Sequence, residues 1–159
     1  MRRGAAKSIR LTRLHSIPKN KKSNAGPETH SMTSGQNDLV KITRSFFDSI
    51  QRRDWGSATE LIHPEARALQ NVSGQETNAR ELLQSMQGLV SSLKDFSYEN
   101  IRSIACPHAV VEQHDVHMLK ANGGEVVLDV CIILRFDDAG LIVRIDEYFD
   151  SAPLSGLLN

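Results

Sequence analysis

The stretch that decides the fold is GLIVRIDEYFD, residues 140–150, close to the end of the 159-residue chain. Its side chains alternate with the period of two that a β-strand imposes. One face carries Leu141, Val143, Ile145, Glu147 and Phe149, and the other carries Ile142, Arg144, Asp146, Tyr148 and Asp150. Glu147 is therefore the one charged side chain among apolar neighbours, on the face that should point into a core.

A carboxylate in this position is costly unless it is hydrogen-bonded or protonated. Burial favours the neutral form, so we expect the pKa of Glu147 to lie above its ordinary value. Such a carboxyl group is a candidate acid or base. The alternatives are a purely structural hydrogen bond, or a local bulge that turns Glu147 outward.

The same period of two extends upstream of this strand. It predicts strands over residues 96–104, 109–119, 125–136 and 141–149, with a further candidate at 66–72. Asn122-Gly123-Gly124 and the turn at 137–140 should join the last three strands as hairpins.

Three helices are predicted before these strands, because apolar residues recur there at the spacing of one helix face. The first begins near Asn37 or Asp38 and ends at residues 54–56, the second covers 57–62, and the third covers 78–93. Asn78 and Glu81 form a capping-box pattern at the start of the third. Helices followed by an antiparallel meander predict an α+β domain, with three N-terminal helices on one face of the sheet.

The strand over residues 110–119 also carries polar side chains. One face holds Val111, Gln113, Asp115, His117 and Leu119, and the other holds Val110, Glu112, His114, Val116 and Met118. Both faces mix polar and apolar groups, so the pattern leaves open which one lines the interior. Asp115 beside His117 would form an acid–base set with Glu147 if it faces inward. A solvated edge or interface strand is the alternative.

Charge divides the chain into two segments. Residues 1–35 hold eight basic residues against one acidic residue, a formal charge of +7, and the remainder holds 11 against 18, a charge of −7. We expect a disordered basic tail over residues 1–35 and a single folded domain over 36–159. A mitochondrial transit peptide, a polyanion-binding or nuclear-localisation cluster at 19–22, and translation from Met32 are alternatives for the tail.

Several classes of protein are excluded. No apolar run approaches the ~20 residues of a membrane span. Two cysteines are too few for a disulfide framework. His114 and His117 would face opposite ways on a strand, so we expect no metal site. The negative domain disfavours nucleic acid, and we expect a cytoplasmic protein with mitochondrial targeting as the alternative.

Residues 38–158 resemble the SnoaL-like polyketide cyclase and limonene-epoxide-hydrolase branch of the nuclear-transport-factor-like superfamily. The resemblance rests on the helical start, on VEQHDV at 111–116 and above all on residues 140–150. It implies a cone-shaped α+β barrel with one central pocket, a homodimer, no cofactor, and a small hydrophobic polyketide-like substrate. The apolar stripe Val126, Leu128, Val130, Ile132 and Leu134 would form either the outer dimer face or the pocket wall.

The epoxide hydrolases of this branch use two carboxylates bridged by an arginine, with a tyrosine and an asparagine holding water. Asp115 and Glu147 match the carboxylates and Asn71 matches the asparagine, but Gln113 and Leu69 replace the arginine and the tyrosine. Without the arginine the carboxylates are less well organised to activate water, so epoxide hydrolysis is the second choice.

The cyclases of this branch close rings by intramolecular aldol chemistry, which requires less of the site. In this reading Asp115 is the base and a neutral Glu147 donates a hydrogen bond to the developing oxyanion. Asn71, Gln113, His117 and Tyr148 would orient the substrate. A non-catalytic ligand-binding or dimerisation module is the third alternative, because fold does not imply function.

Overall fold

The computed structural model describes residues 34–157, and every structural statement below concerns that part of the chain. Its helices are α1 (Ser34–Gln51), α2 (Trp55–Glu60), α3 (Ala79–Ser91) and the 3-10 helix η1 (Ala152–Leu157). Its strands are β1 (Ile62–Gln70), β2 (Glu76–Asn78), β3 (Leu93–Cys106), β4 (Ala109–Lys120), β5 (Glu125–Phe136) and β6 (Ile142–Phe149). The predicted tail, its targeting alternatives and the Met32 start lie outside the described residues, except that α1 already begins at Ser34.

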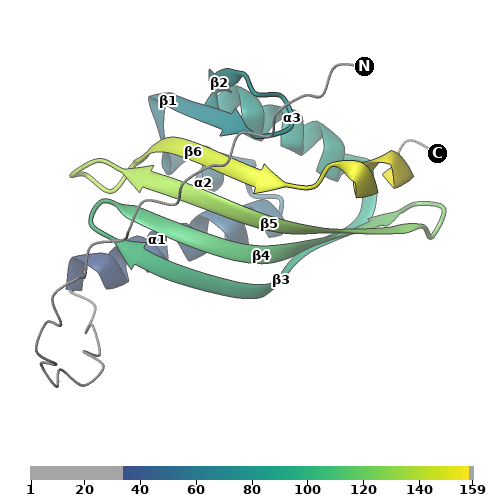
Figure 1. Ribbon diagram of the computed structural model, residues 1–159, viewed down its shortest axis with the longest axis horizontal. Coiled ribbons are helices and arrows are strands. Elements are labelled where there is room, and N and C mark those ends of the chain that lie inside the picture. Colours follow the sequence, from purple (N-terminus) through teal and green to yellow (C-terminus); the bar gives the residue numbers. More distant parts are fainter. Residues whose placement is uncertain (1–33, 158–159) are drawn as a thin grey trace, which may run out of the picture. The chain divides into compact units, whose positions relative to one another are not determined.

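The six strands form one mixed sheet in the order β2-β1-β6-β5-β4-β3 (Figure 1). β3 to β6 are an antiparallel meander, whereas β1 runs parallel to β6 and β2 runs antiparallel to β1. The predicted α+β class is confirmed, with three helices against a mixed sheet. The sheet is not closed into a barrel, because β2 and β3 remain its two edges.

The helices cover one face of the sheet, which we call the inner face; the opposite face is the outer face. α1 buries Phe46, Phe47 and Ile50 there. The apolar stripe of β5 is also buried and belongs to the same core. Of the two alternatives for this stripe, the structure therefore selects the inner wall. No helix within the described residues is long and apolar enough to cross a bilayer.

The turn between β4 and β5 determines which residues of β4 face inward. Gly123 adopts a φ of +88° there, and the amide of Lys120 donates to the carbonyl of Gly124 at 2.8 Å. This turn pairs Met118 with Val126 and His114 with Val130. Directly paired residues lie on the same face, so the even-numbered residues of β4 share the inner face with the β5 stripe.

The turn between β5 and β6 does the same for Glu147. The Asp137 carboxylate accepts hydrogen bonds from the amides of Ala139 and Leu141. Gly140 adopts a φ of +83°, and a Cβ there would approach the Cδ1 atom of Ile42 at 3.1 Å. The predicted hairpin is confirmed, and the register that follows pairs Glu147 with Ile132 of the inner stripe.

α3 begins at the predicted cap. The Oδ1 atom of Asn78 accepts from the amide of Arg80 at 2.8 Å, and its Nδ2 atom donates to the carbonyl of Pro64 at 2.9 Å. The same side chain thus ends β2, starts α3 and ties both to β1. β1 itself starts at Ile62, where the sequence pattern predicts a helix end, because it pairs with the distant β6.

Replacing Asn78 with Ala should lower the free energy of unfolding by about 1–2 kcal/mol, because the first turn of α3 loses its cap. Urea denaturation measures the difference. Asn78→Asp keeps the accepting oxygen and should retain most of the stability. An unchanged urea midpoint in Asn78→Ala would show that the cap contributes nothing.

Candidate active site

A cavity of about 310 Å³ lies between the helices and the inner face of the sheet. This volume is within the range of small-molecule sites. Its walls are mostly apolar and come from α1, α3, η1 and all the strands except β2. The polar side chains that line it are Gln70, Ser85, Tyr98, His114 and Glu147. A ligand in this cavity would therefore meet few polar groups.

Glu147 reaches the cavity from the last part of β6. The parallel pairing of β1 with β6 sets Gln70 opposite it, and the Nε2 atom of Gln70 donates to the Oε2 atom of Glu147 at 2.5 Å. Burial raises the pKa of Glu147, although the hydrogen bond from Gln70 and the nearby His114 oppose the increase. A carboxyl group that keeps its proton above the ordinary range can donate that proton to a ligand.

His114 reaches the same cavity from β4 and is oriented from behind by Glu112. Both side chains are buried, and the Nδ1 atom of His114 lies 3.2 Å from the Oε1 atom of Glu112. Ser103 donates to the other carboxylate oxygen at 2.9 Å. A carboxylate only accepts, so the shared proton belongs on Nδ1 and the lone pair is left on Nε2. No hydrogen bond of Nε2 is found among residues 34–157, and an imidazole whose proton lies on Nδ1 can accept a proton at Nε2.

Tyr98 of β3 completes the polar wall. Its ring packs edge-on against His114, with 4.9 Å between the ring centroids. Its hydroxyl oxygen is buried and has no hydrogen-bond partner among the described residues. Burial raises the pKa of Tyr98 well above its ordinary value, and the carboxyl groups of Glu147 and Glu112 add to the effect. The hydroxyl is therefore a neutral donor.

Asp115, Gln113 and His117 do not line the cavity. They are odd-numbered residues of β4, so alternation puts them on the outer face. Asp115 accepts a hydrogen bond from Asn100 at 2.5 Å, and the Nε2 atom of His117 lies 3.6 Å from the Oε2 atom of Glu99. The expected grouping of Asp115 and His117 with Glu147 is not assembled, and the inward residues of β4 are Glu112 and His114.

Asn71 and Tyr148 also lie away from the cavity lining. Asn71 follows β1 and exchanges two hydrogen bonds with the backbone of Phe149, at 2.9 and 3.1 Å. These two hydrogen bonds fasten the end of β1 to β6. Tyr148 is 46% exposed and projects from the face of β6 opposite Glu147.

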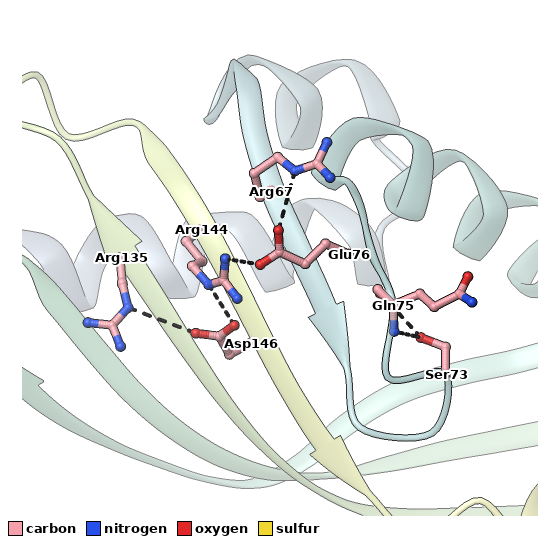
Figure 2. A network of polar contacts seen from close by, with 7 residues as sticks. All are labelled: Arg67, Ser73, Gln75, Glu76, Arg135, Arg144 and Asp146. Atoms are coloured by element: carbon pink, nitrogen blue, oxygen red, sulfur yellow. Dashed lines mark hydrogen bonds and ion pairs between the residues drawn. The ribbon is translucent and has the colours of Figure 1, made fainter.

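An ion-pair network lies on the outer face of the sheet, around Arg144 and Asp146 of β6 (Figure 2). Arg144 of β6 contacts both Glu76 of β2, at 2.5 Å, and Asp146, at 2.7 Å. Arg67 and Arg135 extend the network, at 3.9 Å from Glu76 and 3.8 Å from Asp146. In the parallel pairing of β1 with β6, Arg67 lies opposite Arg144, and three residues later Gln70 lies opposite Glu147. The ion-pair network around Arg144 therefore supports the register that places Gln70 beside Glu147.

The described residues contain no group of three or more His, Cys, Asp or Glu side chains arranged to hold a metal ion. Five polar groups that the structure brings to this region are not selected by the sequence analysis: Gln70, Ser85, Tyr98, Glu112 and His114. Four of them line the cavity and the fifth, Glu112, orients His114.

Comparison with solved structures places the fold. AclR from Streptomyces galilaeus, provisionally assigned as a hydroxylase, has a TM-score of 0.68 and 17% identity over 77% of this chain and 82% of its own. A protein from Xanthomonas campestris pv. campestris, provisionally assigned as a polyketide cyclase, has a TM-score of 0.64 and 18% identity over 74% and 93%. An LEH-like epoxide hydrolase from M. tuberculosis has a TM-score of 0.64 and 20% identity over 78% and 92%. Likeness at these identities establishes the shared fold alone.

Comparison with curated protein sequences finds no match. The family model of the SnoaL-like domain matches residues 43–145, from the middle of α1 to the middle of β6. This match covers more than half of the chain and confirms the resemblance. The protein therefore belongs to the SnoaL-like domain family.

Proposed function

We propose that the protein is a cofactor-independent polyketide cyclase that closes a ring by intramolecular aldol addition. The observation that carries the proposal is the pair of His114 and Glu147, which reach one apolar cavity from two strands. Glu112 leaves the imidazole with a free lone pair, and burial keeps the carboxyl group of Glu147 protonated above its ordinary range. Family membership and the cyclases among the similar structures favour this class of reaction.

In the proposed reaction the Nε2 atom of His114 takes a proton from a methylene carbon between two carbonyl groups, where C–H bonds are already acidic. The resulting enolate carbon attacks a second carbonyl carbon of the same molecule. A carbon–carbon bond forms, and the π electrons of that carbonyl move to its oxygen. Glu147 gives its proton to this oxygen, and the imidazolium then returns a proton to Glu147.

No atom is gained or lost in this sequence, so no co-reactant is needed. The apolar walls have their own task, which is to hold a flexible chain with its reacting carbons close together. Excluding water from the cavity also protects the enolate from protonation by solvent.

Epoxide hydrolysis has less support in this cavity. That reaction, as the resemblance describes it, needs two carboxylates bridged by an arginine. Only one carboxyl group, Glu147, lines the cavity within residues 34–157, and the lining there includes no arginine. Asp115, the expected second carboxylate, projects from the outer face.

Glu147→Gln removes the acid while keeping the size of the side chain. Ring closure should slow by about a hundredfold or more, in line with the usual contribution of a positioned acid. The measurement is mass spectrometry of metabolites from strains of the source organism that carry wild type, a deletion or the variant. The variant should lose a cyclised product and accumulate a precursor of equal mass, because aldol addition conserves mass. Water addition to an epoxide would instead change the mass.

Glu125→Gln is the matched control, because Glu125 is exposed at the start of β5 and makes the same carboxyl-to-amide change. Asp115→Asn separates the two assignments of the base. The variant keeps a side-chain oxygen that can accept from Asn100, and its position on the outer face should leave ring closure intact. If the deletion loses the product while Glu147→Gln behaves as wild type, the acid–base proposal fails and a binding module is favoured.

The raised pKa of Glu147 also predicts a pH dependence of stability. Below the ordinary value of 4.5 the side chain is protonated in both the folded and the unfolded states. As the pH rises above 4.5, the unfolded chain loses this proton first. The contribution of Glu147 to the free energy of unfolding of the wild type therefore falls until Glu147 ionises in the folded state as well.

The amide introduced by Glu147→Gln cannot titrate. The difference in the free energy of unfolding, variant minus wild type, should therefore increase with pH across this window and become constant above it. Urea denaturation at a series of pH values measures the difference, with Glu125→Gln as the control. A difference that does not change with pH would show that folding does not raise the pKa of Glu147.

A further inference from the structure

Tyr98 carries a polar atom whose presence the fold alone does not explain. Its hydroxyl is buried and unpaired within residues 34–157, although buried polar groups are nearly always hydrogen-bonded. Only one other buried side-chain atom of the described residues shares this condition, the hydroxyl of Thr43, and Thr43 does not line the cavity. Phenylalanine would supply the same ring packing without the unpaired group, so a partner from outside the chain is indicated.

We infer that the Tyr98 hydroxyl donates a hydrogen bond to a carbonyl oxygen of the substrate, the oxygen on which negative charge develops when His114 removes a proton. This inference rests on the proposed ring closure and adds a third group to its site. The ligand class is a carbonyl compound that forms an enolate, bound with its oxygen toward β3. Tyr98 is thereby distinguished from Glu147, which protonates the second oxygen.

The position of Tyr98 next to the base fits this role. In an enolate the oxygen is two bonds away from the carbon that loses its proton. The donor and the base must therefore come from neighbouring side chains. Tyr98 and His114 are in ring contact, and their strands pair directly, with Tyr98 opposite Val116.

The ring of Tyr98 is also fixed before any ligand arrives. Phe47 and Phe96 pack edge-on against it, each with centroids 5.0 Å away. Its backbone amide donates to the Oε1 atom of Gln51 in α1 at 3.0 Å. A donor that is already in place stabilises a developing charge without reorganisation at the moment of reaction. Burial raises its pKa, so the hydroxyl keeps the proton that it must donate.

The test uses 4-nitrophenol. Its ionised form, like an enolate, carries a negatively charged oxygen on a planar carbon framework. Binding to the full-length protein is followed by the absorbance of the probe. Tyr98→Phe should weaken binding about tenfold or more, the usual loss for a hydrogen bond to a charged group. Tyr148→Phe is the matched control, because the other tyrosine of the chain lies on the outer face and should bind the probe as wild type does.

Thermal unfolding of the free variants separates this role from a structural one. Removing an unpaired hydroxyl should leave the Tm of Tyr98→Phe equal to or above that of the wild type, whereas loss of a structural hydrogen bond would lower it. Equal affinity of Tyr98→Phe and wild type for the probe would overturn the inference. So would a wild type that fails to bind the probe at millimolar concentration, or a lowered Tm with unchanged binding.

Fluorotyrosine labelling provides a measurement that does not depend on the folding of Tyr98→Phe. The chain has two tyrosines, so the signal lost in Tyr148→Phe assigns the other to Tyr98. Addition of 4-nitrophenol should shift the Tyr98 signal, and an unmoved signal would contradict the inference. Because none of these experiments involves turnover, they are independent of the ring-closure assay. Normal ring closure by Glu147→Gln would overturn the role of Glu147 as the acid, and the binding of the probe by Tyr98→Phe would still decide the role of Tyr98 separately.

Discussion

The register between β4, β5 and β6 determines which side chains reach the cavity. Two tight turns fix it, one around Gly123 and one around Gly140. The result is a row across five strands, in which Ser103, Glu112, Ile132, Glu147 and Gln70 are successive pairing partners. A slip of one residue in any strand would turn its whole set of side chains to the other face. The candidate chemistry thus depends on backbone geometry at turns outside the cavity.

The same row explains how the apolar interior tolerates two carboxyl groups. Glu112 is compensated by Ser103 and by the imidazole of His114, and Glu147 by the amide of Gln70. Glu112 is enclosed by its partners, whereas Glu147 remains in contact with the cavity. Because Glu147 has a single neutral partner, burial is the dominant influence on its pKa. One carboxyl group therefore organises the base, and the other is available as an acid.

Much of this arrangement could be predicted from the sequence, but only where the signal is local. Alternation in β6 indicates the inward direction of Glu147. Alternation in β4 is ambiguous and leaves open which face points inward, and the structure places Asp115 on the outer face. The turn at 122–124 determines which residues of β4 face inward. Counting back across it pairs Val116 and His114 with the apolar stripe of β5. The position of Gln70 cannot be predicted in this way, since it depends on parallel pairing of β1 with β6, where its partner Glu147 lies 77 residues away.

The inward position of Tyr98 cannot be predicted from the sequence for a different reason. Tyr98 and Ser103 both serve the inner face, although five positions along a regular strand would put them on opposite faces. The register of β3 shifts between Glu99 and Arg102, where Asn100 adopts a φ of +52°. Asp115 accepts a hydrogen bond from this same asparagine. Asp115, the base expected from the resemblance, thus contacts this irregularity from the outer face. The same irregularity allows β3 to place both Tyr98 and Ser103, the serine that donates to Glu112, on the inner face.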